Sequence, residues 1–292
     1  MKNFFFLLYA EIVTVLLFVT IYLPSIDDSI KIISTYAQYE LDENGIIMYD
    51  YNGVQGKVYN PLVVATFGLN YYDEYLKNID KDYNIKKFIN SANWILDNLK
   101  NKGEYSILEY KFPWIFYGWI EPPYASALAQ SKAMYLLMLA YDVTGDKKYY
   151  EGTQKILNSF LVDYDDGGVV SYENNNNSSL FLHLLAKPDT QKTYVLNGHT
   201  GSLIFLWKYY EKTKDPTVES IFTKGINYLK ENLLLYDTGL WSYYDLMNNL
   251  APTTYHKGQI KQFETLYEIT EETILKEYAD RFKKYLKYKL LK

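Results

Sequence analysis

The sequence has no cysteine, one arginine and three histidines among its 292 residues. The lack of cysteine excludes disulfides, thiol catalysis and cysteine-ligated metal sites. Because Arg281 is the only arginine, a ligand carboxylate must be bound mainly by lysine, histidine, tyrosine or backbone donors. The net charge of −5 provides no broad basic surface, so we expect no nucleic-acid partner.

Among the residues that are present, tyrosine is unusually frequent, with 33 copies in the chain. A phenol combines an apolar ring with a polar tip, which suits a groove that stacks sugar rings and hydrogen-bonds their hydroxyls. The alternative is a compositional bias of the genome, since Asn, Lys and Ile are also plentiful. Hydrophobic residues make up 48% of the chain and charged residues 22%, which indicates a folded protein with a sizeable core.

The N-terminus contains a run of twenty nearly all apolar residues, 4–23, in which Glu11 is the one charge. A helix of that length reaches roughly 30 Å, the thickness of the hydrocarbon core of a bilayer. Lys2 precedes the run and acidic residues follow it, which favours an extracytoplasmic domain. We therefore expect residues 1–26 to be a single-pass transmembrane signal anchor. A cleaved signal peptide is the alternative, although no small-x-small cleavage site follows the run.

Residues 27–58 are expected to form a linker and a small β-hairpin. Two Asn-Gly pairs, at 44–45 and 52–53, flank a run of β-branched and aromatic residues. Asn-Gly is the strongest short-range signal for a tight hairpin turn.

The rest of the chain, residues 59–292, shows successive helical patterns. The expected helices cover residues 61–76, 84–99, 126–144, 147–161, 198–213, 216–234, 259–267 and 272–290. They form about four pairs, in each of which a largely apolar helix precedes an amphipathic one. This alternation predicts a mainly α protein, an α/α toroid with an inner and an outer ring of helices. An ordinary helical bundle is the alternative.

Four segments carry motifs that point to one family. They are Tyr59-Asn60-Pro61 with the helix that follows, Glu121-Pro122-Pro123-Tyr124-Ala125-Ser126, Val195-Leu196-Asn197-Gly198, and Tyr244-Asp245-Leu246 with Tyr255-His256. In this order and spacing they resemble the C-terminal domain of D-glucuronyl C5-epimerases, which convert D-glucuronate into L-iduronate within heparan-type chains. The resemblance implies an α/α barrel and a uronate-containing glycan as partner.

The resemblance also implies that tyrosines transfer the protons. Inversion at C5 needs a base on one side of the sugar ring, an acid on the other, and donors around the carboxylate. Tyr244 and Tyr255 match two tyrosine positions of the family. We expect them to lie in the loop before the last inner helix and to face one substrate from two sides.

Five further residues are expected to bind substrate on the same grounds. They are Glu121, Tyr124, Asn197, His256 and Gln259. Simpler roles are open for three of them: Asn197 could cap a helix, Glu121 could start one favourably, and His256 could be a packing residue.

We expect no cofactor and no metal. His183 and His199 show no metal-ligand spacing with carboxylates. Asp163, Asp165 and Asp166 lie close enough in sequence to hold calcium, but Asp-Gly loops are commonly solvated turns.

Three positions depart from the family pattern. The family has a Glu-Glu-Tyr-Pro segment where this chain has Leu185-Ala186-Lys187-Pro188, so both the acid and the tyrosine are absent. Met247 replaces an arginine, and Gln259 replaces a histidine. Lys187 falls at the missing tyrosine, and we hypothesise that it acts catalytically as a proton carrier or carboxylate clamp.

The leading interpretation is a uronate C5-epimerase that acts on a cell-surface glycan. A uronate lyase or a glycoside hydrolase of similar fold is the second; a hydrolase would need two carboxylates across a cleft, for which Glu121 and Asp245 are candidates. A non-catalytic glycan-binding protein is the third. The resemblance adds that the protein could be a homodimer.

Overall fold

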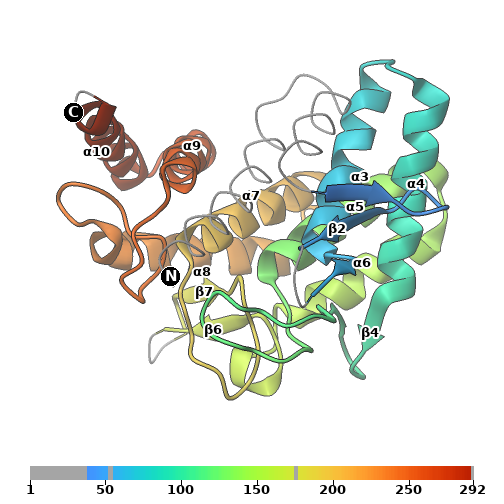
Figure 1. Cartoon of the computed structure of the whole chain (residues 1–292), viewed down its shortest axis with the longest axis horizontal. Helices are drawn as coiled ribbons and strands as arrows, with labels where there is room; N and C mark the ends of the chain where they lie inside the picture. The colour runs from blue at the N-terminus through green and yellow to red at the C-terminus, as the bar shows by residue number, and fades with distance from the viewer. Residues whose placement is uncertain (1–37, 52–54, 174–176, 291–292) are drawn as a thin grey trace. The chain divides into compact units, whose positions relative to one another are not determined.

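The chain is predominantly helical, as predicted. The computed structural model describes residues 38–51, 55–173 and 177–290, and in these it contains eight α-helices and three small antiparallel sheets (Figure 1). Their contacts divide the chain into two compact units, Met1–Ser159 and Phe160–Lys292. Each unit holds two helix pairs.

The first unit opens with the predicted hairpin, extended by a third strand. Strands β1 (Gln38–Leu41), β2 (Ile47–Asp50) and β3 (Lys57–Val58) form an antiparallel sheet in that order. Gly45, at φ +75°, makes the tight turn between β1 and β2, and the Asp42 carboxylate accepts the amide of Ile46 at 2.7 Å. The second Asn-Gly pair lies outside the described residues.

Two helix pairs and one hairpin complete the first unit. They are α3 (Pro61–Leu76), α4 (Lys81–Asn98), the hairpin of β4 (Leu99–Asn101) and β5 (Ser106–Leu108), α5 (Ala127–Thr144) and α6 (Lys147–Ser159). Helices α3 and α5 are largely buried and contact each other, as expected for inner helices. Gly68 allows the close approach, because a Cβ there would lie 2.4 Å from Leu136 Cδ1.

The second unit begins with a short 3₁₀ turn and a two-stranded sheet. Its elements are η1 (Tyr164–Asp166), β6 (Val170–Tyr172), β7 (Leu180–Leu182), α7 (Leu196–Thr213), α8 (Pro216–Asn232), η2 (Leu233–Tyr236), α9 (Thr253–Thr270) and α10 (Thr273–Leu290). Helices α7 and α9 contact each other, while α8 and α10 pair with them from outside. Closure of all four pairs into one toroidal domain over 59–292 stays a prediction.

The largest error in the predicted helix boundaries is at the start of α9. Helix α9 begins at Thr253, six residues before the predicted start, so Tyr255 lies on its first turn and not in the preceding loop. Thr and Gly are weak helix formers, which hides this turn in the sequence. Tertiary packing stabilises it, because Tyr255 and His256 are buried there.

In the parts of the chain that the structure describes, no helix is long and apolar enough to cross a membrane. The predicted transmembrane segment, residues 4–23, lies outside those parts. Its insertion and the extracytoplasmic placement of the domain stay predictions.

His199 connects three elements of the second unit. Its Nδ1 accepts the Leu182 amide of β7 at 3.0 Å, and its Nε2 donates to the Gly225 carbonyl of α8 at 3.0 Å. The ring also stacks on Phe181, with centroids 4.6 Å apart. Burial lowers the pKa of His199 to about 3, so the ring is neutral in the folded protein.

This histidine should make the protein sensitive to acid. The unfolded chain takes up the proton below about pH 6.5 and the folded chain only near pH 3. Stability is therefore complete above pH 6.5 and falls on acidification, by about 1.4 kcal/mol per pH unit for this single proton. Urea unfolding between pH 7 and pH 4 measures the slope. His199→Gln keeps one hydrogen-bond acceptor and one donor but does not titrate. It should therefore reduce the slope of unfolding free energy against pH by the contribution of one proton, and an unchanged slope would contradict this assignment.

Candidate active site

The loop between η2 and α9 carries Tyr244 and is held in shape by Asp245. One carboxylate oxygen of Asp245 accepts the amides of Met247 at 2.9 Å and Asn249 at 3.2 Å, and the other accepts the Asn249 side-chain amide at 2.9 Å. Asp245 is fully buried. These bonds close a tight turn directly after Tyr244 and fix the position of its backbone.

The same loop is hydrogen-bonded to the start of α7. The Tyr244 carbonyl accepts the Leu196 amide at 3.0 Å, and the Leu246 amide donates to the Thr193 carbonyl at 3.2 Å. The first amides of a helix have no partner within it, so the loop supplies one. The beginning of α7 and the Tyr244 turn are thereby held side by side.

Tyr244 and Tyr255 are in direct contact. Their ring centroids lie 4.9 Å apart at an interplanar angle of 61°, and their side chains are hydrogen-bonded. Only 6% of Tyr244 and 5% of Tyr255 is exposed. This spacing leaves no room for a sugar ring between the phenols, so the predicted arrangement on two sides of a substrate would require them to separate.

Burial raises the pKa of Tyr244 above its ordinary value, and the neighbouring Asp245 carboxylate raises it further. The hydrogen bond with Tyr255 lowers this pKa, but by less than the other two effects raise it. Tyr244 is therefore protonated at neutral pH. In that state a phenol donates a proton or a hydrogen bond to developing negative charge.

Asn197 ties α7 to α9 and does not cap a helix. Helix α7 begins at Leu196, and no side chain caps it. The Asn197 amide instead donates to the Tyr255 carbonyl at 3.2 Å and to Gln262 Oε1 at 3.1 Å. Its Oδ1 is buried and has no hydrogen-bond partner within the described residues, which leaves one acceptor beside the tyrosine pair.

His256 and Gln259 are fully buried and hold the loop in place. Ser242 Oγ lies 2.7 Å from His256 Nδ1 and also hydrogen-bonds Gln259, whose amide donates to the Tyr243 carbonyl at 2.9 Å. His256 Nε2 donates to the Phe282 carbonyl at 2.9 Å. These contacts give both residues a positioning role, and the geometry offers no support for direct contact with substrate.

Comparison with known proteins identifies the family. The family described as D-glucuronyl C5-epimerase C-terminus matches residues 100–284, well over half of the chain. The chain belongs to this family.

Two relatives and one solved structure are similar to the chain. A D-glucuronyl C5-epimerase of Caenorhabditis elegans is 28% identical over 222 residues, covering 67% of this chain and 34% of the relative. An uncharacterised protein of Methanocaldococcus jannaschii is 26% identical over 177 residues, covering 61% of this chain and 57% of the relative. The solved structure of a GH76 alpha-mannanase from Bacteroides thetaiotaomicron has a TM-score of 0.54 at 15% identity, covering 92% of this chain and 69% of the mannanase. That likeness concerns the fold alone.

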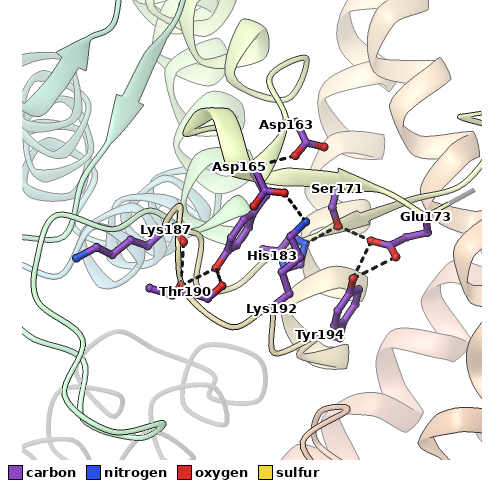
Figure 2. A network of polar contacts seen from close by, with 10 residues as sticks. Asp163, Asp165, Ser171, Glu173, His183, Lys187, Thr190, Lys192 and Tyr194 are labelled. Atoms are coloured by element: carbon purple, nitrogen blue, oxygen red, sulfur yellow. Dashed lines mark hydrogen bonds and ion pairs between the residues drawn. The ribbon is translucent and has the colours of Figure 1, made fainter.

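Lys187 is half-buried in a turn of this epimerase-family chain. Its carbonyl accepts the Thr190 hydroxyl at 2.8 Å, which closes the turn. Its side chain points away from Glu173 and Tyr194 (Figure 2). The predicted role of Lys187 stays a hypothesis.

A polar network that the sequence did not reveal lies between β6, β7 and the start of α7 (Figure 2). The Tyr194 hydroxyl donates to both Glu173 oxygens at 3.1 Å, and Ser171 also donates to Glu173. His183 Nε2 lies 2.7 Å from Ser171 Oγ and donates to it, because the Ser171 proton goes to Glu173. Burial raises the pKa of Tyr194 to about 12 and lowers that of His183 well below its usual value. No short sequence motif predicts this network, because its members are spread over 24 residues, 171–194.

Glu121 and Tyr124, the two residues of the first unit that were predicted to bind substrate, differ in exposure. Glu121 is exposed and accepts the Trp119 indole N–H at 2.5 Å. Tyr124 is buried and stacks on Tyr110, with centroids 4.8 Å apart. Tyr124 therefore supports its own segment, whereas Glu121 is accessible to a ligand.

The aspartates considered for calcium have other roles. Asp163 Oδ1 accepts the Asp165 amide at 3.0 Å, and Asp165 pairs with Lys192 at 3.0 Å (Figure 2). Within the described ranges, no group of three or more metal-ligating side chains is placed to hold an ion.

Proposed function

We propose that the chain is an epimerase that inverts C5 of a uronic-acid residue in a glycan. The carrying observation is the contact between Tyr244, in the loop before α9, and Tyr255, on the first turn of α9, in a member of the C5-epimerase family. The C5–H bond breaks, its electron pair moves into the neighbouring carboxylate group as an enolate, and a proton returns to the opposite face. No redox partner is needed.

The two phenols have unequal roles in this proposal. Tyr244, a neutral phenol at neutral pH, donates the proton to C5. Tyr255 has to react as the phenolate to accept the proton that leaves C5, so its own proton is first lost to solvent. After the turnover, transfer of that proton from Tyr255 to the Tyr244 phenolate restores the starting state of the pair. Binding of the sugar separates the rings so that each phenol reaches one face.

The substrate carboxylate requires donors nearby. Met247 stands where the family has an arginine, so this chain must neutralise the enolate differently. The motif position of Lys187 supports it as the replacement clamp. Lys187→Ala should then raise KM for the uronate polymer by about tenfold or more. Unchanged KM and kcat in an active preparation would end this assignment.

Incubation with a uronate polymer in heavy water tests the reaction itself. An epimerase places deuterium at C5 and leaves the chain length unchanged. A lyase would instead create an unsaturated uronate that absorbs in the near ultraviolet. Absence of deuterium from C5 across glucuronate- and mannuronate-containing polymers, under conditions in which the protein is folded and binds them, would refute the proposal.

The hydrolase alternative finds less support. A glycosidase needs a carboxylate that can reach the scissile bond. Both oxygens of Asp245 are hydrogen-bonded within their own loop, and the residue is fully buried.

We place the enzyme outside the cytoplasm, tethered by residues 1–26, with a toroidal domain. The apolar run supports the tether, and the alternation of buried and amphipathic helices supports the toroid. Protease added to intact cells should degrade the domain; complete protection would refute this orientation.

A further inference from the structure

An aromatic hairpin projects from the first unit between β5 and α5. Trp114 and Ile120 are paired through both backbone hydrogen bonds, at 2.9 and 2.8 Å. Gly118, at φ +98°, lies in the turn, where a side chain would strain the backbone. From Phe112 to Ile120 the sequence contains no charged residue.

The hairpin has two different faces. Side chains alternate along a strand, so the pairing of Trp114 with Ile120 places Ile115 opposite Trp119 on the other face. These two are exposed, Ile115 to 38% and Trp119 to 57%. The hairpin therefore presents an apolar outer face.

Glu121 lies on the same face as Trp119, two residues further along. The Trp119 indole N–H donates to Glu121 Oε1 at 2.5 Å. This bond fixes the orientation of the indole and places the Glu121 carboxylate at the edge of an exposed ring.

The inner face is anchored on a rigid aromatic base. Trp114 meets Tyr124 edge to face, with centroids 6.0 Å apart, and Tyr124 stacks on Tyr110 at 4.8 Å and 13°. This base holds the hairpin in place, while the bond to Glu121 orients Trp119, and an aromatic ring fixed in this way loses little conformational entropy on binding a ligand. Ile115 and Trp119 together make an apolar patch with a polar residue at its edge, which is the kind of exposed patch that marks interaction sites.

We propose that the outer face of this hairpin is a glycan-binding subsite that takes a neutral hexose or N-acetylhexosamine residue. The sugar would stack its apolar C–H face on Trp119 and donate a hydroxyl to Glu121. The proposal rests on the proposed function only for the expectation that the ligand is a glycan.

The charge at the site selects the class of sugar. A uronate placed on Trp119 would bring its carboxylate next to that of Glu121, and like charges at such a distance repel each other. The same carboxylate opposes insertion of this face into lipid, because a charged group is costly to move into hydrocarbon. A neutral unit of the polymer avoids both costs.

Binding by the full chain tests this subsite directly. Neutral gluco-oligosaccharides and N-acetylhexosamine oligosaccharides are titrated while intrinsic tryptophan fluorescence is followed. Trp119→Ala should weaken binding of at least one of them by about tenfold or more, the scale of losing an aromatic contact at the centre of a binding surface. Trp119→Phe should lose less, and Glu121→Gln should weaken binding severalfold.

Leu76→Ala is the matched control, because Leu76 is an apolar residue that is 58% exposed but lies on α3, outside the hairpin. It should bind as the unaltered chain does. Equal binding by the Trp119→Ala chain would overturn the proposal, as would Trp119-dependent binding to phosphatidylserine-containing vesicles without binding to neutral sugars.

The outcome separates this subsite from the epimerase proposal. In an active preparation, Trp119→Ala should raise KM for the polymer and leave kcat unchanged. If no deuterium exchange occurs but sugar binding still depends on Trp119, the subsite stands and the epimerase proposal fails. If exchange proceeds with the same KM in the Trp119→Ala chain, the subsite fails alone.

Discussion

Replacing Tyr244 by phenylalanine is expected to lower the rate of deuterium incorporation at C5 by about 10²–10⁴-fold, the usual contribution of a positioned acid or base. Phenylalanine retains the ring contact with Tyr255 and removes only the hydroxyl. In the proposed mechanism the Tyr244 hydroxyl is the group that returns the proton to C5. The change should therefore affect kcat far more than substrate binding.

Tyr243 provides the control for this experiment. It is the adjacent tyrosine in the same loop and is half-buried. Tyr243→Phe should retain nearly full activity. Tyr255→Phe should match Tyr244→Phe, and the double variant should lose little more than either alone, since groups that act as a unit are not additive. Full activity of Tyr244→Phe would exclude it from the proton transfer.

Asp245→Ala should lower the free energy of unfolding by about 3 kcal/mol. Three hydrogen bonds to a buried carboxylate would be lost, and the donors of Met247 and Asn249 would be left unpaired. Urea denaturation of the variant and of Glu211→Ala, an exposed acid of the same unit, measures the difference. Glu211→Ala should be within about 0.5 kcal/mol of the unaltered chain.

Asp245→Asn distinguishes structure from chemistry. An amide keeps one accepting oxygen, so stability should be partly restored, and activity should recover with it if Asp245 only shapes the loop. Unchanged stability together with complete loss of activity in both variants would instead make Asp245 a catalytic carboxylate and would favour the hydrolase interpretation.

The helical fold was largely predictable, because apolar spacing depends on local sequence. Predicted and observed bounds agree for 61–76 and nearly agree for most other helices. The start of α9 was missed, since Thr253 and Gly258 are weak helix formers and this turn is stabilised by contacts with α7, such as that between Gly258 and Asn197.

The candidate site was harder to predict from the sequence than the helices were. Nothing in the spacing of Tyr244 and Tyr255 distinguished them among 33 tyrosines, and the family resemblance alone singled them out. The burial of His256 and the binding of Glu173 by Tyr194 arise from contacts between distant segments. Such contacts leave no local pattern.

The hydrogen bond from the Leu196 amide to the Tyr244 carbonyl joins the start of α7 to the turn that carries Tyr244, so local opening of the turn breaks it. Displacing the tyrosine turn exposes that one amide to water, while amides deeper in α7 keep their intrahelical partners. Hydrogen exchange at a single backbone position therefore reports how often the turn lifts from the helix, without any substrate or label.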